Sequence, residues 1–391
     1  MASTDDWRRA LTAMQRFNNV RRIQKASHPA ALTASATTLE NDAYTSSISR
    51  EDYDAACDLL AKPPAEPTTS HGPADNDDTD NDHSTGIDIG TYKNCRYIAS
   101  GTSAEVYRSG AVALKVCTVG LECPPHNVAR EAKILKQLQT TDNSASNNII
   151  QLRETLYDAE QQLVLVLPYM PLTLQAVLRG DEDSKIPRSR LQSYFVDLLS
   201  ALESLHSQGI VHRDVKPSAV LLQSIDGPAY LSDFGTAWHP QFSVEDEPAD
   251  AKVLDVGTGP YRAPEVLFGD QAYGASVDMW AVGAMLAECA RPAPHKPLFE
   301  SRAVHEDGNQ LGLILSIFKT IGTPTRESWP EAASFRTPPF EMYRVFEPQP
   351  WEAILPDVDE YLRAIVASLV RYDSTRLTSE QVGAMMLPER F

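Results

Sequence analysis

The sequence predicts an α+β fold in two lobes, a small lobe rich in β-strands followed by a large helical lobe. Alternating apolar and polar residues at 95–100, 105–109, 112–116 and 163–167 indicate short strands, because successive side chains of a strand point to opposite faces. Beyond Leu191 the apolar residues recur every three to four positions, which is typical of an amphipathic helix. A further helix is expected at about 127–138, after the stop signals Pro124 and Pro125.

The 391 residues are expected to form a tail and one folded domain. Residues 1–90 are predicted to be a mostly disordered N-terminal tail with short helices at 5–25 and 47–61 and an acidic linker, since 62–86 is rich in Pro, Thr, Ser, Asn and Asp. Ser47 or Ser49 is the expected cap of the second helix, and Leu59 and Leu60 are expected on its apolar side. Residues 91–391 are predicted to be the domain, with the small lobe at about 91–170 and the large lobe at about 171–391.

Composition limits the classes of partner. The net charge is −18, part of it in an acidic tract at 75–82, and this argues against nucleic acid or an anionic membrane as the main partner, because both are polyanions. No apolar run approaches the length of a membrane span, and the N-terminus lacks the apolar core of a signal peptide. Five scattered cysteines without a C-x-x-C pair indicate reduced thiols. We therefore expect a protein of the cytoplasm, the nucleus or both.

The strongest chemical signal is His-Arg-Asp-Val-Lys-Pro at 212–217, followed by Asp-Phe-Gly at 233–235. Asp233 comes 19 residues after Asp214, and this combination is far more specific than the first motif alone. Phosphoryl transfer requires positioning of the attacking hydroxyl and compensation of the phosphate charge. Asp214 is the candidate base for a substrate hydroxyl, Lys216 is expected to contact the transferred phosphate, and Asp233 is the candidate metal ligand.

A lysine at the end of an apolar strand predicts the phosphate-binding group. Lys115 closes the run Val-Ala-Leu-Lys at 112–115, and a buried lysine needs a carboxylate partner. Glu131, on the next predicted helix, is the candidate partner. Together these four residues form the predicted catalytic set, which is Asp214, Lys216, Lys115 and Glu131.

A nucleotide pocket is expected between the two lobes. The phosphate-covering loop at 99–106 keeps only its middle glycine, Gly101, where the backbone can approach phosphate closely. Residues 165–170 resemble a strand and hinge that hold adenine. This resemblance implies that Leu167 is the gatekeeper, that Pro168 and Met170 offer main-chain groups to adenine, and that Leu221 forms the floor. The predicted pocket residues are Ala99, Gly101, Val106, Ala113, Lys115, Leu167, Pro168, Met170 and Leu221.

With these motifs in place, residues 91–391 resemble a eukaryotic protein kinase. Tyr-Arg-Ala-Pro-Glu at 261–265, Val-Asp-Met-Trp at 277–280 and Ile-Gly-Thr-Pro at 321–324 resemble the CMGC group, nearest the cyclin-dependent kinases. Pro-Pro-His-Asn at 124–127, the glycine-poor loop and Gly-Thr-Gly at 257–259 resemble the fungal monomeric kinases that activate cyclin-dependent kinases. Within this fold, Glu265 is expected to pair with Arg376, and Asp278 to accept hydrogen bonds from the catalytic-loop backbone.

The resemblance implies a bilobal kinase fold with ATP and Mg²⁺ as cofactors. It further implies a monomeric serine/threonine kinase, independent of a cyclin, that phosphorylates the activation-loop threonine of cyclin-dependent kinases in cell-cycle or transcription control. Lys216, two residues after Asp214, suits a serine or threonine acceptor.

The activation loop departs from the cyclin-dependent kinases. Their phosphorylated threonine corresponds to Val253, and the third arginine of the cluster that holds the phosphate corresponds to Trp238. Arg130 and Arg213 remain, so an acidic residue of the loop could dock on them without phosphorylation. The alternative is a solvated acidic loop. The acidic residues of this stretch are Glu245, Asp246, Glu247 and Asp250.

Ala219 stands where the motif H-R-D-x-x-x-x-N has its metal-binding asparagine. Alanine cannot coordinate Mg²⁺, so at least one ion is expected to rely on Asp233 and phosphate oxygens. A normal one-metal kinase, a slow kinase and a nucleotide-binding pseudokinase that holds a client kinase all remain open, and the complete catalytic set favours activity. A further alternative is a CMGC kinase with Ser/Thr-Pro substrates, which Arg262 could support.

Overall fold

A computed structural model describes residues 19–20, 22–23, 40, 43–44, 47, 49–61, 86–101, 104–117, 124–141, 148–180, 186–301, 310–340 and 344–387. The chain divides into two units, residues 1–86 and 87–391. Most of the helix predicted at 5–25 and the whole acidic tract at 75–82 lie outside the described residues.

The first unit contains helix α4 (Arg50–Leu60). Ser49 is its N-cap, as predicted, because the Ser49 hydroxyl accepts the backbone N–H of Asp52 at 3.1 Å. The buried side of α4 carries Tyr53 and Cys57, one turn apart. The prediction for Leu59 was wrong, because its side chain faces solvent and is 69% exposed.

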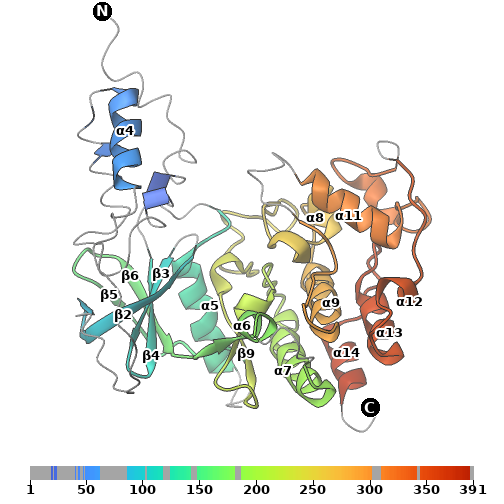
Figure 1. Cartoon of the computed structure of the whole chain (residues 1–391), viewed down its shortest axis with the longest axis horizontal. Coiled ribbons are helices and arrows are strands. Elements are labelled where there is room, and N and C mark those ends of the chain that lie inside the picture. The colour runs from blue at the N-terminus through green and yellow to red at the C-terminus, as the bar shows by residue number, and fades with distance from the viewer. Residues whose placement is uncertain are drawn as a thin grey trace, which may run out of the picture. The chain divides into compact units, whose positions relative to one another are not determined.

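The small lobe of the second unit is built on one antiparallel sheet of six strands, in the order β1-β2-β3-β4-β6-β5 (Figure 1). All four predicted strands are present, and two further short strands, β1 and β5, flank them. The strand bounds are β1 (Ile87–Ile89), β2 (Tyr92–Ser100), β3 (Ala104–Ser109), β4 (Val112–Cys117), β5 (Glu154–Tyr157) and β6 (Leu163–Pro168).

Helix α5 (Val128–Thr141) lies beside this sheet and confirms the helix predicted at 127–138 (Figure 1). Its first turn is capped by Asn127, whose side-chain oxygen accepts the backbone N–H of Arg130 at 2.7 Å. Ile134, Leu135 and Leu138 are buried at helical spacing. Burial of this face fixes the rotation of α5 about its axis, and this sets the direction in which Glu131, in the first turn, points.

The large lobe is mostly helical and completes the predicted α+β, two-lobed fold. Its long helix α7 (Arg188–His206) buries the predicted apolar face, and α9 (Ser276–Ala290) is buried along almost its whole length. A small sheet, β7-β8-β9, lies next to the catalytic loop. The remaining bounds are β7 (Leu172–Thr173), α6 (Leu174–Leu178), β8 (Val220–Leu222), β9 (Ala229–Leu231), α8 (Pro264–Leu267), α11 (Leu311–Ile321), α12 (Trp351–Ile354), α13 (Glu360–Leu369) and α14 (Ser379–Met386).

Two buried polar contacts hold the catalytic loop and the end of the activation loop, and both were predicted. Asp278 on α9 accepts the backbone N–H groups of His212 and Arg213 at 2.9 and 2.8 Å. Burial would raise the pKa of Asp278, but the hydrogen bond from His206 and the nearby histidines lower it. Arg376 donates to Glu265 at 2.9 Å, with both side chains almost fully buried. The catalytic residues are therefore attached to the helical core.

Candidate active site

Lys115 lies between two carboxylates. Its ammonium group donates to Glu131 at 2.8 and 2.9 Å and to Asp233 at 2.9 Å. Burial would lower the pKa of Lys115, but Asp233 and Glu131 outweigh that effect and raise it. Lys115 in turn holds the pKa of Asp233 well below its usual range. The predicted Lys115–Glu131 ion pair is present, and Lys115 and Asp233 are both charged at neutral pH.

Asp233 has a backbone conformation that points its carboxylate toward the site. Its φ of 64° places it in the left-handed region, where a non-glycine residue is uncommon and often functional. The next residue, Phe234, is fully buried and packs edge-on against the ring of His212, with centroids 5.0 Å apart. The side chain of Asp233 itself is about half exposed, at 48%. Its carboxylate is therefore accessible to a ligand that approaches from the site.

Asp214 and Lys216 form a second group of contacts with Thr258 from the activation loop. The Thr258 hydroxyl donates to Asp214 at 2.6 Å, and Lys216 donates to Thr258 at 3.1 Å and also to Asp214. Asp214 thus already accepts a hydrogen bond from an aliphatic hydroxyl, the group that a serine or threonine substrate would bring. The contact between Thr258 and Asp214 was not predicted. The position of Thr258, seven residues before Glu265, was the only signal for it in the sequence.

Five of the predicted pocket residues share one face of the six-stranded sheet. In the strand register Ala99 opposes Val106, Val106 opposes Lys115, and Ala113 opposes Leu167. Directly opposed residues point to the same side of a sheet, so the five side chains line one surface. Leu114 and the other alternate residues of β4 are buried on the opposite face.

The other predicted pocket residues border this face. Pro168 ends β6, and the next residue, Tyr169, donates its N–H to the Ala111 carbonyl at 3.0 Å. Met170 and Leu221 are half-buried and pack against the main core, with Leu221 on β8. Gly101 donates its N–H to the Ala104 carbonyl at 2.7 Å across the loop tip, where residues 102 and 103 lie outside the described part.

The residues present provide for one metal ion better than for two. The half-exposed carboxylate of Asp233 is a suitable oxygen ligand for a divalent ion, which would neutralise phosphate charge when bound. Ala219 is buried, offers no side-chain oxygen, and its carbonyl already accepts two hydrogen bonds from Ser232, each 2.9 Å long. Among the described residues, no group of three His, Cys, Asp or Glu side chains is arranged to hold a metal.

Comparison with known proteins identifies the family. The protein kinase domain model matches residues 92–386, which is most of the chain. The chain is a protein kinase. The serine/threonine-protein kinase csk1 of Schizosaccharomyces pombe is 34% identical over 291 residues, which cover 71% of this kinase and 88% of csk1. The serine/threonine-protein kinase CAK1 of Saccharomyces cerevisiae is 28% identical over 284 residues, which cover 61% of this kinase and 76% of CAK1.

These matches give the kinase its reaction class. It is a protein serine/threonine kinase, a family whose members use ATP and a divalent metal ion, and the predicted resemblance to fungal kinases of this type is confirmed. The structure brings Lys115, Glu131 and Asp233 together in one ion-paired group and Asp214 and Lys216 together in another.

Proposed function

We propose that this kinase transfers the γ-phosphate of Mg²⁺-bound ATP to the activation-loop threonine of a cyclin-dependent kinase, and so acts in cell-cycle or transcription control. Asp214 orients the threonine hydroxyl, Lys216 contacts the transferred phosphate, Lys115 holds the α- and β-phosphates, and Asp233 binds the metal. The observation that carries the proposal is the Lys115–Glu131–Asp233 group, which is assembled within a single chain. The substrate class follows from the resemblance to fungal kinases that activate cyclin-dependent kinases.

Independence of a cyclin is supported by internal contacts at the start of α5. In protein kinases the position of this helix controls activity, because it carries the glutamate that pairs with the lysine. Here the backbone N–H of Asn127 donates to the carbonyl of Gly235 at 2.9 Å, which ties the helix to the metal-binding loop. The Arg130 guanidinium donates to the carbonyl of Pro125. The chain thus supplies contacts that position Glu131 without a partner protein.

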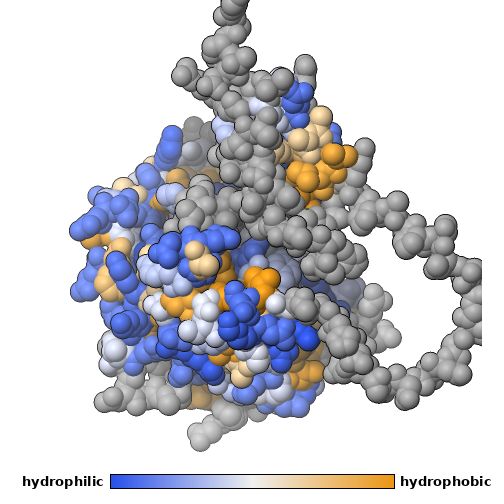
Figure 2. Space-filling model, turned by 90° about the vertical axis from the view of Figure 1, so that its left-hand side faces the viewer, coloured by the Kyte–Doolittle hydropathy of each residue, from blue (hydrophilic) through white to orange (hydrophobic). Residues whose placement is uncertain are grey.

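We further propose that the kinase is a monomer and acts in the cytoplasm or nucleus, where its scattered cysteines would stay reduced. Figure 2 shows one face of the molecule, on which hydrophilic residues predominate among those drawn in colour and apolar residues form small, separate patches. Permanent subunit interfaces are usually large and apolar, so this face does not suggest one. None of the helices in the described part is both long and apolar enough to cross a lipid bilayer.

The test is transfer of labelled phosphate to a catalytically inactive cyclin-dependent kinase in the absence of cyclin. We expect the label on the activation-loop threonine, with little transfer when that threonine is replaced by alanine. Asp214→Asn should reduce transfer to background, because the amide is a poor proton acceptor. Equal labelling of the threonine-free substrate would contradict the proposed specificity, and equal labelling by Asp214→Asn would contradict the assigned site.

A second candidate, a kinase for Ser/Thr-Pro sites, is favoured by the backbone at Gly257. Gly257 precedes Thr258, which contacts Asp214, so its backbone lies close to the acceptor position. Its φ of 81° is in the left-handed region that favours glycine, and its carbonyl accepts two hydrogen bonds from Arg262, at 3.0 and 2.8 Å. A carbonyl engaged in this way cannot accept a hydrogen bond from the backbone N–H of a substrate. Most substrate residues would therefore leave this N–H without a partner here, whereas proline has no N–H.

We therefore expect a preference for proline directly after the acceptor residue in short peptides. The preference over alanine should be about fivefold, the equivalent of one net hydrogen bond of about 1 kcal/mol. Arg262→Ala releases the Gly257 carbonyl and should reduce the preference. The measurement is kcat/KM for paired peptides that differ only at this position, with both forms of the kinase. Equal kcat/KM for both peptides with the unaltered kinase would exclude this candidate.

A further inference from the structure

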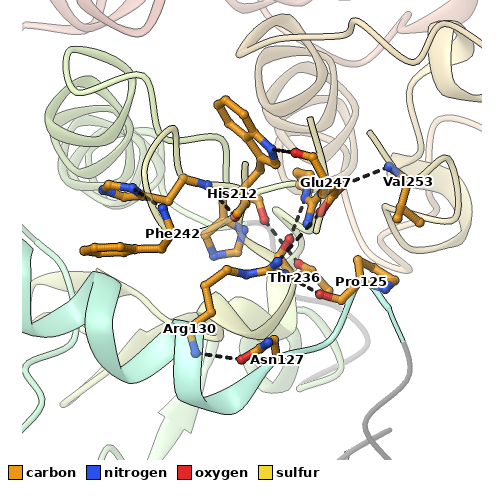
Figure 3. A network of polar contacts seen from close by, with 12 residues as sticks. Pro125, Asn127, Arg130, His212, Thr236, Phe242, Glu247 and Val253 are labelled. Carbon is orange, nitrogen blue, oxygen red and sulfur yellow. Dashed lines mark hydrogen bonds and ion pairs between the residues drawn. The ribbon is translucent and has the colours of Figure 1, made fainter. Parts of the chain in front are cut away.

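A single buried carboxylate, that of Glu247, fixes the activation loop (Figure 3). One oxygen of Glu247 accepts hydrogen bonds from the guanidinium of Arg213 and from the backbone N–H of Val253, the latter at 2.8 Å. Its other oxygen lies 3.7 Å from the Arg130 guanidinium. The side chains of Glu247, Arg130 and Arg213 are 5%, 7% and 0% exposed, so water screens these contacts little.

The contacts of Glu247 join three elements that carry the catalytic residues. Arg213 lies directly before Asp214 in the catalytic loop, and Arg130 lies directly before Glu131 on α5. Val253 belongs to the activation loop itself. Arg213 also donates to the carbonyl of Thr236, just after the metal-binding loop. One carboxylate therefore holds the base, the glutamate of the ion pair and the activation loop in a common arrangement.

Trp238 and Lys252 complete this arrangement. The Trp238 indole N–H donates to the carbonyl of Glu247 at 2.9 Å, and the Lys252 ammonium lies 4.8 Å from the Trp238 ring centre. Trp238 thus replaces the third arginine of the cluster by binding the backbone of the acidic residue. Docking of an acidic residue is confirmed for Glu247, whereas the three other candidates, Glu245, Asp246 and Asp250, are exposed.

The arginine pair has more hydrogen-bonding capacity than Glu247 uses. Within the described part of the chain, Nε of Arg130 and Nη2 of Arg213 are buried and have no hydrogen-bond partner. A phosphorylated side chain brings three oxygens and a charge of about −1.5 to −2, whereas a carboxylate brings two oxygens and one charge. An arginine cluster with more hydrogen-bond donors than a bound carboxylate uses is expected where a fixed anion takes the place of a phosphate.

We infer that Glu247 is a positioning residue that replaces the activating phosphate of the loop. A carboxylate from the chain itself cannot be removed by a phosphatase, and Val253, at the position of the usual threonine, has no hydroxyl to phosphorylate. The kinase is therefore held permanently in its active arrangement, and its regulation does not pass through phosphorylation of this loop. The inference does not depend on which protein is the substrate.

The test compares Glu247→Gln, which keeps the shape and removes the charge, with the exposed control Glu245→Gln. Turnover should fall on the order of tenfold to a hundredfold for Glu247→Gln, because charge-assisted contacts to both arginines are lost. The KM for ATP should change less than about twofold, because the Lys115 group keeps its own ion pairs and Asn127 still ties α5 to Gly235. Glu247→Asp, which keeps the charge, should retain more turnover than Glu247→Gln. Both transfer to an inactive cyclin-dependent kinase and ATP hydrolysis without protein substrate are measured, so that a wrong substrate is distinguishable from a wrong role for Glu247.

Two further measurements test the role of Glu247 even if Glu247→Gln folds poorly. Formate should restore part of the turnover of Glu247→Ala by occupying the space between the two arginines, whereas chloride at equal ionic strength should not. The unaltered kinase, treated with phosphatase and shown by intact mass to carry no phosphate, should keep its full turnover. Loss of turnover after this treatment, or equal turnover of Glu247→Gln and Glu245→Gln, would overturn the inference.

Discussion

Lys115→Met should abolish measurable phosphate transfer and weaken ATP binding. Lys115 lies within 2.9 Å of both Glu131 and Asp233, and methionine of similar length removes the cation between these carboxylates. Two uncompensated carboxylates would then face each other and the phosphates of ATP. Loss of such a preorganised charge costs at least about a hundredfold in rate, and more where several charges depend on it. The measurements are ATP affinity by calorimetry and transfer of labelled phosphate.

Lys133→Met is the matched control for this experiment. Lys133 lies on the same helix as Glu131, but its side chain is exposed to solvent. The same loss of charge at this position should leave transfer and ATP affinity within about twofold of the unaltered kinase, since surface charge pairs contribute little. Unchanged transfer by Lys115→Met would refute the assigned nucleotide site, whatever the result for the control.

Restoring the missing metal ligand with Ala219→Asn should raise transfer and lower the Mg²⁺ concentration that it requires. Ala219 is buried at the end of the catalytic loop, where asparagine would add a side-chain oxygen near Asp233. One additional contact in the transition state corresponds to a few kcal/mol, on the order of a hundredfold in rate. The gain should be smaller if the half-buried Ser218 or water already substitutes for the ligand. The measurement is turnover against Mg²⁺ and Mn²⁺ concentration.

Ala219→Leu is the control for the change in size. Leucine has the same number and branching of side-chain heavy atoms as asparagine but has no oxygen, and filling a packed site with extra atoms usually costs stability. We therefore expect Ala219→Leu to be less stable than the unaltered kinase and no more active. If Ala219→Asn and the unaltered kinase show the same turnover and the same metal dependence, the position is irrelevant to metal binding.

The sequence predicted the strands that carry a clear apolar pattern. Every second residue of β4 from Val112 to Val116 is buried, which gives an alternating pattern, whereas β6 buries the consecutive residues Val164, Leu165 and Val166 and shows as a continuous apolar run. Strand β5 was not predicted because three of its four residues are exposed, and its place at the sheet edge leaves little apolar pattern. Leu59 was misplaced for a similar reason, since Tyr53 and Cys57 already form the buried side of α4.

The candidate site was predictable where the burial of one charged residue requires a partner of opposite charge. A lysine in the apolar strand β4 requires a carboxylate, and Glu131 on the next helix supplies it. Thr258 beside Asp214 could not be predicted from pattern, because the contact joins residues 44 positions apart. The sequence likewise offered four acidic residues to the arginine pair, and only the path of the folded loop selects Glu247.

The central claim is that this site transfers phosphate although Ala219 has replaced a metal ligand. The most direct measurement is the initial rate of labelled phosphate transfer by the unaltered kinase over a range of Mg²⁺ concentrations, with Asp214→Asn as the blank. Transfer above the blank is expected, with a shallow, non-cooperative dependence on Mg²⁺ and a requirement for higher Mg²⁺ than Ala219→Asn. No transfer at any metal concentration, together with an active Ala219→Asn variant, would contradict the claim and make the natural chain a pseudokinase.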